Sequence, residues 1–379
     1  MPGIYFHIPF CKSICSYCDF YKTTNTEKIE TLVSMLQKEM DLQSTYLSTK
    51  KIETIYFGGG TPSLLSISQF NELLHACHSA FNIDTKVEIT AEVNPDDLTS
   101  DYLKSLRKTG VNRLSIGIQS FVANDLKLMK RRHSSAQALN AVKLAQKAGF
   151  DNISVDLIYG IPGMKLKQWE ENLNKVFELG IQHISAYHLS YHKNTKLWND
   201  LKNGSIHEVL EEDSINQFSM LIDKAIENGF EHYEISNFAE NGLYSQHNSS
   251  YWKQTEYLGL GPSAHSFNIA SRQWNVSNID KYIVSLQQNK VPAKIEKLSL
   301  SDQYNDYVIT SLRTKWGLDR NFIQNTFGER YVEHLNRIID KYSSSGKIIF
   351  ENNTVNLTRE GLFVSDAIMA DFIILNTLI

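Results

Sequence analysis

The sequence has few of the residues that build fibrous, secreted or membrane-spanning proteins. Its 379 residues include only four cysteines, seven prolines and 19 glycines, which excludes a disulfide-stapled scaffold and a collagen-like or low-complexity chain. No apolar run approaches the ~20 residues that cross a bilayer. The first residues lack the basic and long apolar segments of a signal peptide. We therefore expect a cytoplasmic protein.

The sequence also lacks a surplus of positive charge. Acidic residues number 42 and basic residues 38, which gives a net charge of −4 and excludes a bulk binder of nucleic acid or of anionic membranes. Hydrophobic residues make up 42% and charged residues 21% of the chain, a composition that supports a sizeable buried core. The length suggests two or three domains.

Short β-rich runs alternate with amphipathic segments from Ile4 to about Tyr187. The expected strands are Ile4–Ile8, Ile52–Phe57, Lys86–Val93, Arg113–Ile118, Ile153–Ile158 and His183–Tyr187. The expected helices are Lys28–Leu47, Ser66–Phe81, Ser100–Lys108, Ser134–Lys147 and Leu166–Leu179. This alternation predicts an α/β fold with a parallel sheet, as in a partial (β/α)6 barrel, whose working residues follow the carboxyl ends of the strands. An open doubly wound sheet is the alternative.

The remaining chain follows a different pattern. Expected helices at Asp302–Thr314, Arg320–Phe327 and Tyr331–Ser343 precede a hairpin of Lys347–Phe350 with Thr354–Leu357, an order typical of a winged-helix-like α+β domain. Acidic residues outnumber basic ones there, so we expect packing or partner docking rather than DNA binding. We therefore divide the chain into a partial barrel over 1–200, a barrel-capping region over 201–295 and the C-terminal domain over 296–379.

Three of the four cysteines, Cys11, Cys15 and Cys18, form a C-x3-C-x2-C loop directly after the first expected strand. Three thiolates on one loop can hold three corners of a [4Fe–4S] cluster and leave one iron open. That iron can bind the amino and carboxylate groups of S-adenosylmethionine, and the reduced cluster can then release a deoxyadenosyl radical. A zinc site would need a fourth ligand, and a redox pair of Cys15 and Cys18 leaves Cys11 unexplained. The fourth cysteine, Cys77, is predicted to be a buried helix residue.

Polar residues follow several of the expected strands. The run Gly58-Gly59-Gly60-Thr61-Pro62 lets a ligand approach the backbone, although a tight turn would also explain it. Glu92 can meet a ribose hydroxyl or an amino group, or can simply begin a helix. Gln119 ends the next strand, and Asp156 needs a partner if its charge is buried within its apolar strand. Arg131 could recognise a carboxylate or could belong to a solvated basic face.

The flanks of the cysteine loop carry a family resemblance. Tyr5-Phe6-His7-Ile8-Pro9-Phe10-Cys11 and Tyr17-Cys18-Asp19-Phe20 resemble the loop of radical S-adenosylmethionine proteins, in the branch that contains oxygen-independent coproporphyrinogen III oxidase and haem chaperones. The resemblance covers nearly the whole chain and implies a [4Fe–4S] cluster on Cys11, Cys15 and Cys18. It implies that the following residues contact S-adenosylmethionine, in one site or two: Tyr5, Gly59, Gly60, Thr61, Glu92, Gln119, Arg131 and Asp156.

Two departures from the oxidase branch favour the chaperones. The oxidases have a further cysteine one residue after the third and a long segment before the loop, whereas here Asp19-Phe20 follows Cys18 and the first cluster cysteine is residue 11. In addition, His247-Asn248-Ser249-Ser250-Tyr251-Trp252 matches the H-N-x-x-Y-W signature of haem chaperones. The resemblance thus implies haem binding by His247, Asn248, Tyr251 and Trp252, with an imidazole as axial ligand.

The sequence leaves open a different role for this motif and a different histidine as the haem ligand. The aromatic residues of the motif could plug the barrel mouth while His247 makes an ordinary hydrogen bond. His188, His192 and His265 are weaker candidates for the haem ligand.

Three functions are consistent with these features. The first, which we expect, is a carrier that takes haem as cargo to acceptor apo-haemoproteins, membrane-bound respiratory proteins among them. The resemblance also implies a homodimer and a peripheral contact with the membrane, and we expect no nucleic-acid partner. The second is an oxygen-independent coproporphyrinogen III oxidase, an activity that we do not expect. The third is a radical enzyme acting on an unrelated small molecule.

Overall fold

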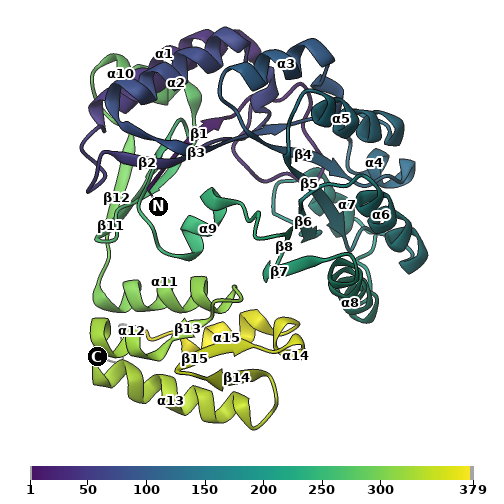
Figure 1. Ribbon diagram of the computed structural model, residues 1–379, viewed down its shortest axis with the longest axis vertical. Helices are drawn as coiled ribbons and strands as arrows, with labels where there is room; N and C mark the ends of the chain where they lie inside the picture. The colour runs from purple at the N-terminus through teal and green to yellow at the C-terminus, as the bar shows by residue number, and fades with distance from the viewer. Residues whose placement is uncertain (1, 376–379) are drawn as a thin grey trace.

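The computed structural model describes residues 2–375 and is built around a 12-stranded sheet with a smaller C-terminal unit beside it (Figure 1). The central strands are β1 (Gly3–Ile8), β2 (Lys51–Gly59), β3 (Asn82–Val93), β4 (Arg113–Gln119), β5 (Asn152–Tyr159) and β6 (His183–His188). They are neighbours in chain order, and each pairs with the next in parallel. Because the strand order does not reverse, as it does in a doubly wound sheet, the predicted α/β partial barrel is confirmed.

Helices cover the outer face of these strands (Figure 1). They are α1 (Ile29–Leu42), α2 (Ile67–Ala80), α3 (Ser100–Lys108), α4 (Ala123–Leu128), α5 (Ser135–Lys147) and α6 (Leu166–Glu178). Local sequence fixes where two of them begin, because Ser66 with Gln69 and Ser134 with Gln137 form capping boxes at α2 and α5. Between sheet and helices lies one apolar core, in which the rings of Phe57 and Phe70 are 4.9 Å apart.

The region after β6 extends the sheet at both edges, which the sequence pattern does not predict. Its strands are β7 (Phe230–Glu234), β8 (Asn237–Glu240), β9 (Tyr257–Leu260), β10 (His265–Phe267), β11 (Ser271–Asn275) and β12 (Ala293–Lys297). Strand β8 pairs antiparallel with β6, whereas β9 pairs parallel with β1 at the other edge. The helices of this region are α7 (Lys196–Lys202), α8 (Glu211–Glu227), α9 (Gln246–Trp252) and α10 (Ile279–Gln287). The predicted domain boundaries near residues 200 and 295 stay predictions.

The C-terminal unit has its own apolar core, which includes Tyr304, Leu335 and Phe372. Its helices are α11 (Leu300–Leu312), α12 (Arg320–Phe327), α13 (Glu329–Ser343), α14 (Arg359–Leu362) and α15 (Ser365–Phe372), and its strands are β13 (Leu318–Asp319), β14 (Ile348–Glu351) and β15 (Thr354–Leu357). Three short 3-10 helices, Thr26–Lys28, Pro62–Leu64 and Pro95–Asp97, complete the chain. Within residues 2–375, no helix combines the length and the apolar character needed to cross a membrane.

Candidate cluster and cofactor site

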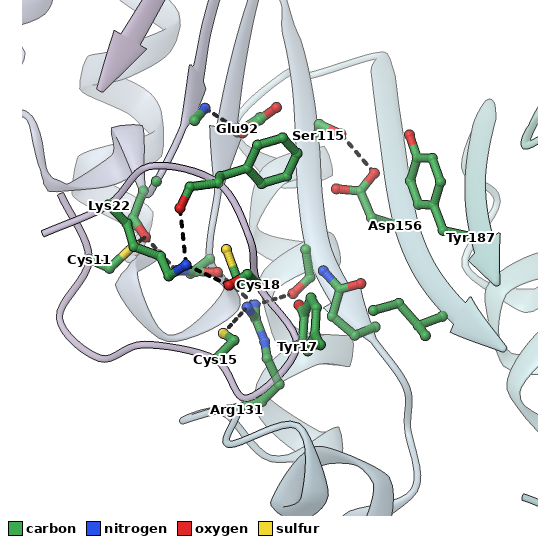
Figure 2. A pocket seen from close by; sticks show the side chains of 18 of the residues that line it. Cys11, Cys15, Tyr17, Cys18, Lys22, Glu92, Ser115, Arg131, Asp156 and Tyr187 are labelled. Atoms are coloured by element: carbon green, nitrogen blue, oxygen red, sulfur yellow. Dashed lines mark hydrogen bonds between the residues drawn. The ribbon is translucent and has the colours of Figure 1, made fainter. Parts of the chain in front are cut away.

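A cavity of about 430 Å³ opens where the carboxyl ends of the parallel strands meet the cysteine loop. Cys11, Cys15 and Cys18 all line it (Figure 2), as the sequence analysis expects of a cluster loop. Cys77 is fully buried in α2 and does not line the cavity. The three thiols of the C-x3-C-x2-C motif are therefore separated from the fourth cysteine by the fold itself.

Backbone hydrogen bonds hold the cysteine loop in place. The Cys11 amide donates to the Thr23 carbonyl over 2.9 Å, and the Thr23 amide donates to the Pro9 carbonyl over 2.7 Å, which closes the loop at its base. At its far side, the Ser16 amide and hydroxyl donate to the carbonyls of Met129 and Leu128. The loop is thereby fixed to the segment between β4 and α5, which also carries Arg131.

A guanidinium group and a hydroxyl group donate hydrogen bonds to the sulfur atoms, and Figure 2 shows Arg131 beside Cys15. Arg131 donates from Nη1 to the Cys15 Sγ over 3.4 Å, and the Thr61 hydroxyl donates to the Cys11 Sγ over 3.6 Å. Burial raises the pKa of Cys11 and of Cys18, while the ammonium group of Lys22 acts in the opposite direction on both. These donors favour the thiolate form, which is the form that binds iron.

The donor set fits a [4Fe–4S] cluster. Among residues 2–375, no three His, Cys, Asp or Glu side chains converge closely enough to hold a single metal ion. A cluster takes one thiolate per iron and so requires separated sulfurs around one cavity, which is what Cys11, Cys15 and Cys18 provide. When bound with one open iron, such a cluster supplies the electron for reductive cleavage of S-adenosylmethionine.

The glycine run at the end of β2 brings the backbone close to the cysteine loop. A Cβ atom on Gly60 would lie 2.7 Å from the Phe10 carbonyl oxygen, so this position requires glycine. The Gly59 amide donates to Glu92 Oε2 over 3.1 Å, and the Tyr56 hydroxyl donates to Glu92 Oε1 over 2.8 Å. Burial, aided by the nearby Asp156 carboxylate, raises the pKa of Glu92 to about 7. Glu92 can therefore change its charge near neutral pH.

Other predicted cofactor contacts come from the next strands. Asp156 on β5 accepts a hydrogen bond from the Ser115 hydroxyl of β4 over 2.9 Å (Figure 2). Arg131 also donates to the Asn94 amide oxygen over 2.6 Å and to the Gly117 carbonyl. Gln119 lies in the left-handed region, with φ of 69°. The predicted cofactor contacts that line the cavity are Gly59, Gly60, Thr61, Glu92, Gln119, Arg131 and Asp156.

Tyr5 is the predicted cofactor contact that does not line the cavity. Its hydroxyl forms a hydrogen bond with His7 Nδ1 over 3.0 Å, and its ring faces that of His247 at 6.3 Å. Burial raises the pKa of Tyr5 well above its ordinary value. Its contact with S-adenosylmethionine stays a prediction.

The H-N-x-x-Y-W motif forms α9, and its histidine is enclosed by protein. His247 is 1% exposed, with Nδ1 hydrogen-bonded to the Thr54 hydroxyl and Nε2 to the Tyr251 hydroxyl, both over 2.8 Å. Burial lowers the pKa of His247 to about 3, so the imidazole is neutral. The Trp252 ring lies against the Arg313 guanidinium of the C-terminal unit, 5.1 Å away. Of the four predicted haem-binding residues, only Asn248 lines the cavity.

Several residues of the cavity wall were not predicted from the sequence. On β4, Arg113, Ser115, Gly117 and Gln119 all line the cavity, although only Gln119 was expected to. Alternate residues of a strand point to the same face, so this period of two was the signal that could have identified the set. Tyr187 of β6 also lines the cavity, and the same period of two relates it to Ser185, another lining residue.

Comparisons with known proteins identify two domain families and full-length relatives. The profile of the Radical SAM superfamily matches residues 5–176, and that of the HemN C-terminal domain matches residues 298–364. The chain is 32% identical to Heme chaperone HemW of Lactococcus lactis subsp. lactis (strain IL1403), over 98% of this chain and 97% of that protein. It is 30% identical to Heme chaperone HemW of Bacillus subtilis (strain 168), over 98% and 99% of the two chains.

A solved structure has the same fold. The structure of coproporphyrinogen III oxidase (HemN) from Escherichia coli, described as a radical SAM enzyme, superposes with a TM-score of 0.85. The two proteins are 22% identical, and the match covers 98% of this chain and 90% of the other. At this identity the likeness concerns the fold.

Proposed function

Because this chain belongs to the Heme chaperone HemW family of radical S-adenosylmethionine proteins, we propose that it binds haem as cargo and delivers it to acceptor apo-haemoproteins. Membership of that family implies a [4Fe–4S] cluster and S-adenosylmethionine. We assign the cluster to Cys11, Cys15 and Cys18 and the cofactor to the cavity that they line. The observation that carries the proposal is the similarity to two proteins of this name over 98% of the chain.

The proposed haem ligand is His247 of the family motif, with Asn248, Tyr251 and Trp252 beside it. Both ring nitrogens of His247 are hydrogen-bonded, so ligation through Nε2 requires the Tyr251 hydroxyl to leave that atom. Haem binding by this residue therefore includes a movement of α9 or of the Tyr251 side chain.

His192 is the second candidate, because it has an open nitrogen at the cavity. It lines the cavity, and its Nδ1 lies 3.3 Å from Asp19 Oδ2, next to Cys18. Among the residues that the structure describes, nothing is hydrogen-bonded to its Nε2. Metal-bound histidines commonly donate their second nitrogen to a carboxylate. His188 also lines the cavity, but its Nε2 is hydrogen-bonded to the Ser214 hydroxyl, and His265 does not line it.

Anaerobic haem titration of the cluster-loaded protein tests the proposal and its ligand. We expect one haem per chain in the wild type and a shifted Soret band in His247→Ala, because loss of an axial nitrogen changes the ligand field of the iron. The exposed His207, which does not line the cavity, provides the control His207→Ala. A shift in His192→Ala alone would transfer the assignment to His192. Absence of stoichiometric haem in the wild type would refute the function.

Further partners belong to the same proposal. Ile14 and Phe20 on the cysteine loop are 48% and 65% exposed, which supports a homodimer formed across this loop. Membrane-bound respiratory proteins are proposed acceptors, reached from the cytoplasm through a peripheral contact with the membrane. Sedimentation of the cluster-loaded protein should give a dimer that Phe20→Ser converts to a monomer, and an unchanged monomer in both forms would contradict it.

The alternative function is oxygen-independent coproporphyrinogen III oxidation, which the fold shared with HemN favours. Asp19 and Phe20 follow Cys18, where the family resemblance implies a further cysteine in the oxidases. We therefore propose that the chain does not oxidise coproporphyrinogen III.

A further inference from the structure

His183 is a fully buried titratable residue of β6 that the proposed function does not use. It does not line the cavity, but both of its ring nitrogens are hydrogen-bonded. Nδ1 is 2.7 Å from the Ser154 hydroxyl of β5, and Nε2 is 2.8 Å from the Tyr233 hydroxyl of β7. Burial, aided by the charge of Arg113, lowers the pKa of His183 well below its ordinary value. The imidazole is therefore neutral, with one donor nitrogen and one acceptor nitrogen.

Two serine hydroxyl groups, which we call the hydroxyl row, lead from His183 to the cavity wall. Ser154 Oγ is 3.3 Å from Ser185 Oγ, and Ser185 of β6 is the register partner of Asp156 of β5. The Ser185 hydroxyl hydrogen-bonds to the Asp156 carboxyl group and acts to lower its pKa. Ser185 and Asp156 line the cavity (Figure 2), whereas Ser154 is fully buried and does not. The hydroxyl row therefore connects His183 to a predicted cofactor contact.

Tyr233 sets the direction of these hydrogen bonds. The backbone of Ser245, the N-cap residue of α9, hydrogen-bonds to the Tyr233 hydroxyl and acts to lower its pKa, as a donor does. Among the side chains of residues 2–375, His183 Nε2 is the partner that is left for the proton of this hydroxyl. Tyr233 therefore donates to Nε2, and the imidazole carries its proton on Nδ1. Nδ1 then donates to Ser154, and each hydroxyl of the row donates onwards to Asp156.

We propose that His183 is a positioning residue that, as the Nδ1–H tautomer, turns the hydroxyl row towards the Asp156 carboxylate. Burial raises the pKa of Asp156, and donated hydrogen bonds act in the opposite direction. Hydrogen bonds in a row polarise one another, so each donor strengthens the next. The result is an ionised acceptor at the cavity wall for a hydroxyl or amino group of a ligand. Contact of Asp156 with S-adenosylmethionine rests on the proposed function, whereas the tautomer of His183 does not.

Other groups also act on the Asp156 carboxyl group from the elements packed around it. They are Arg113 and Ser115 of β4, Arg131 after α4, Glu92 of β3, Tyr56 of β2 and Tyr187 of β6, which also hydrogen-bonds with Ser185. The two arginines and Ser115 favour the carboxylate, whereas the carboxyl group of Glu92 disfavours it. All of these groups remain in variants of His183 and Ser154, so a changed Asp156 pKa in those variants reports the hydroxyl row.

Two measurements on the oxidised, cluster-loaded, full-length protein test the proposal. NMR of protein labelled at the histidine nitrogens reports the tautomer of His183, whose signals are identified by their loss in His183→Phe. We expect the proton on Nδ1. Infrared difference spectra recorded across a range of pH report the pKa of Asp156, whose band is identified by its loss in Asp156→Asn.

Variants of the hydroxyl row extend the second measurement. The Asp156 pKa should rise by about half a pH unit or more in His183→Phe and in Ser154→Ala, a change equivalent to a weak hydrogen bond. Ser154→Thr keeps the hydroxyl and should keep the wild-type pKa. The control His232→Phe should keep it as well, because His232 of β7 hydrogen-bonds to the Ile235 carbonyl outside the row.

Each outcome decides the proposal. A proton on Nδ1, together with a raised Asp156 pKa in Ser154→Ala, supports it. A proton on Nε2 in the wild type overturns it, and so does an Asp156 pKa that is the same in Ser154→Ala and the wild type. Should His183→Phe fail to fold, His183→Gln identifies the NMR signals in its place. Should the wild type not bind S-adenosylmethionine, the proposed function of the cavity fails, and the two measurements still decide the role of His183.

Discussion

At the scale of single residues, the cavity contains one set of groups that face the thiols and a second set, the predicted S-adenosylmethionine contacts, that follows the strands. Arg131 joins the two sets, because it donates to the Cys15 Sγ and to the Asn94 side chain. Thr61 also connects the two sets, because its hydroxyl donates to the Cys11 Sγ and accepts a hydrogen bond from the Asn94 side chain. We therefore expect a change at the thiols to alter the positions of the predicted S-adenosylmethionine contacts through Arg131 and Thr61.

The first prediction concerns the thiols. Replacing Cys11, Cys15 or Cys18 by Ala should abolish the [4Fe–4S] absorption and iron content after anaerobic reconstitution, because three ligands leave no redundancy. Cys77→Ala is the control, since this residue is buried in α2 away from the cavity. Full iron loading in Cys11→Ala, or loss of iron in Cys77→Ala, would refute the assignment.

The second prediction concerns the charge of Glu92, whose pKa burial raises to about 7. Below that pH the carboxyl group is protonated, and above it the group is a carboxylate, which accepts stronger hydrogen bonds from an amino group or a ribose hydroxyl of the ligand. The affinity of the reduced, cluster-loaded protein for S-adenosylmethionine should therefore rise as pH increases from 6 to 8, as followed by electron paramagnetic resonance. Glu92→Gln should bind more weakly and lose this rise. An equal rise in both proteins would contradict the role of Glu92.

At the scale of elements, a buried carboxylate ties α1 to the added edge of the sheet. Glu39 on α1 accepts hydrogen bonds from the Gly261 amide after β9, from Asn275 of β11 and from the Tyr282 hydroxyl of α10. The Gln43 side chain also donates to it. Glu39 is fully buried, and burial raises its pKa to about 7, although the four hydrogen bonds act in the opposite direction. The carboxylate thus fixes β9, and through β9 the neighbouring β1.

The third prediction follows from Glu39. Its folded pKa of about 7 lies above the ordinary value of 4.5, so the folded state binds more protons between these values and stability falls as pH rises through them. Over the full interval the loss amounts to about 3 kcal/mol. Urea unfolding at pH 5 and pH 8 should show a smaller decline in Glu39→Gln than in the wild type. The control Glu30→Gln, at an exposed position of the same helix, should lose as much stability between pH 5 and pH 8 as the wild type. A loss in Glu39→Gln as large as that of the wild type would contradict the assignment of the pH dependence to Glu39.

The elements also show what sequence reasoning could reach. The strands β1–β6 were predictable because apolar runs, helix caps and glycine stops repeat along the chain. The strands added beside β1 were not predictable from the sequence, because β10 has only three residues and β9 pairs with β1, which is about 250 residues earlier. For the same reason the sequence left open whether His247 binds haem or makes an ordinary hydrogen bond, and it did not show the hydrogen bond of His247 to Thr54 on β2. The cysteine loop was predictable since its ligands are neighbours in sequence.

At the scale of the whole molecule, helix α9, which carries the H-N-x-x-Y-W motif, lies between the cavity lined by the three cysteines and the C-terminal unit. Helix α9 connects the two, because Asn248 lines the cavity while Trp252 lies against Arg313 of the C-terminal unit. Arg313 follows α11 directly. Haem bound at α9, as proposed, would therefore lie near both the cavity and the C-terminal unit.

The most direct measurement compares haem binding and porphyrinogen turnover on one anaerobic, cluster-loaded preparation. We predict that this preparation binds one haem per chain and forms no vinyl product from coproporphyrinogen III with S-adenosylmethionine and reductant present. The cluster-free Cys11→Ala protein sets the background of the turnover assay. Turnover at an enzyme-like rate, about 1 per second at the low end, without stoichiometric haem binding would contradict the account.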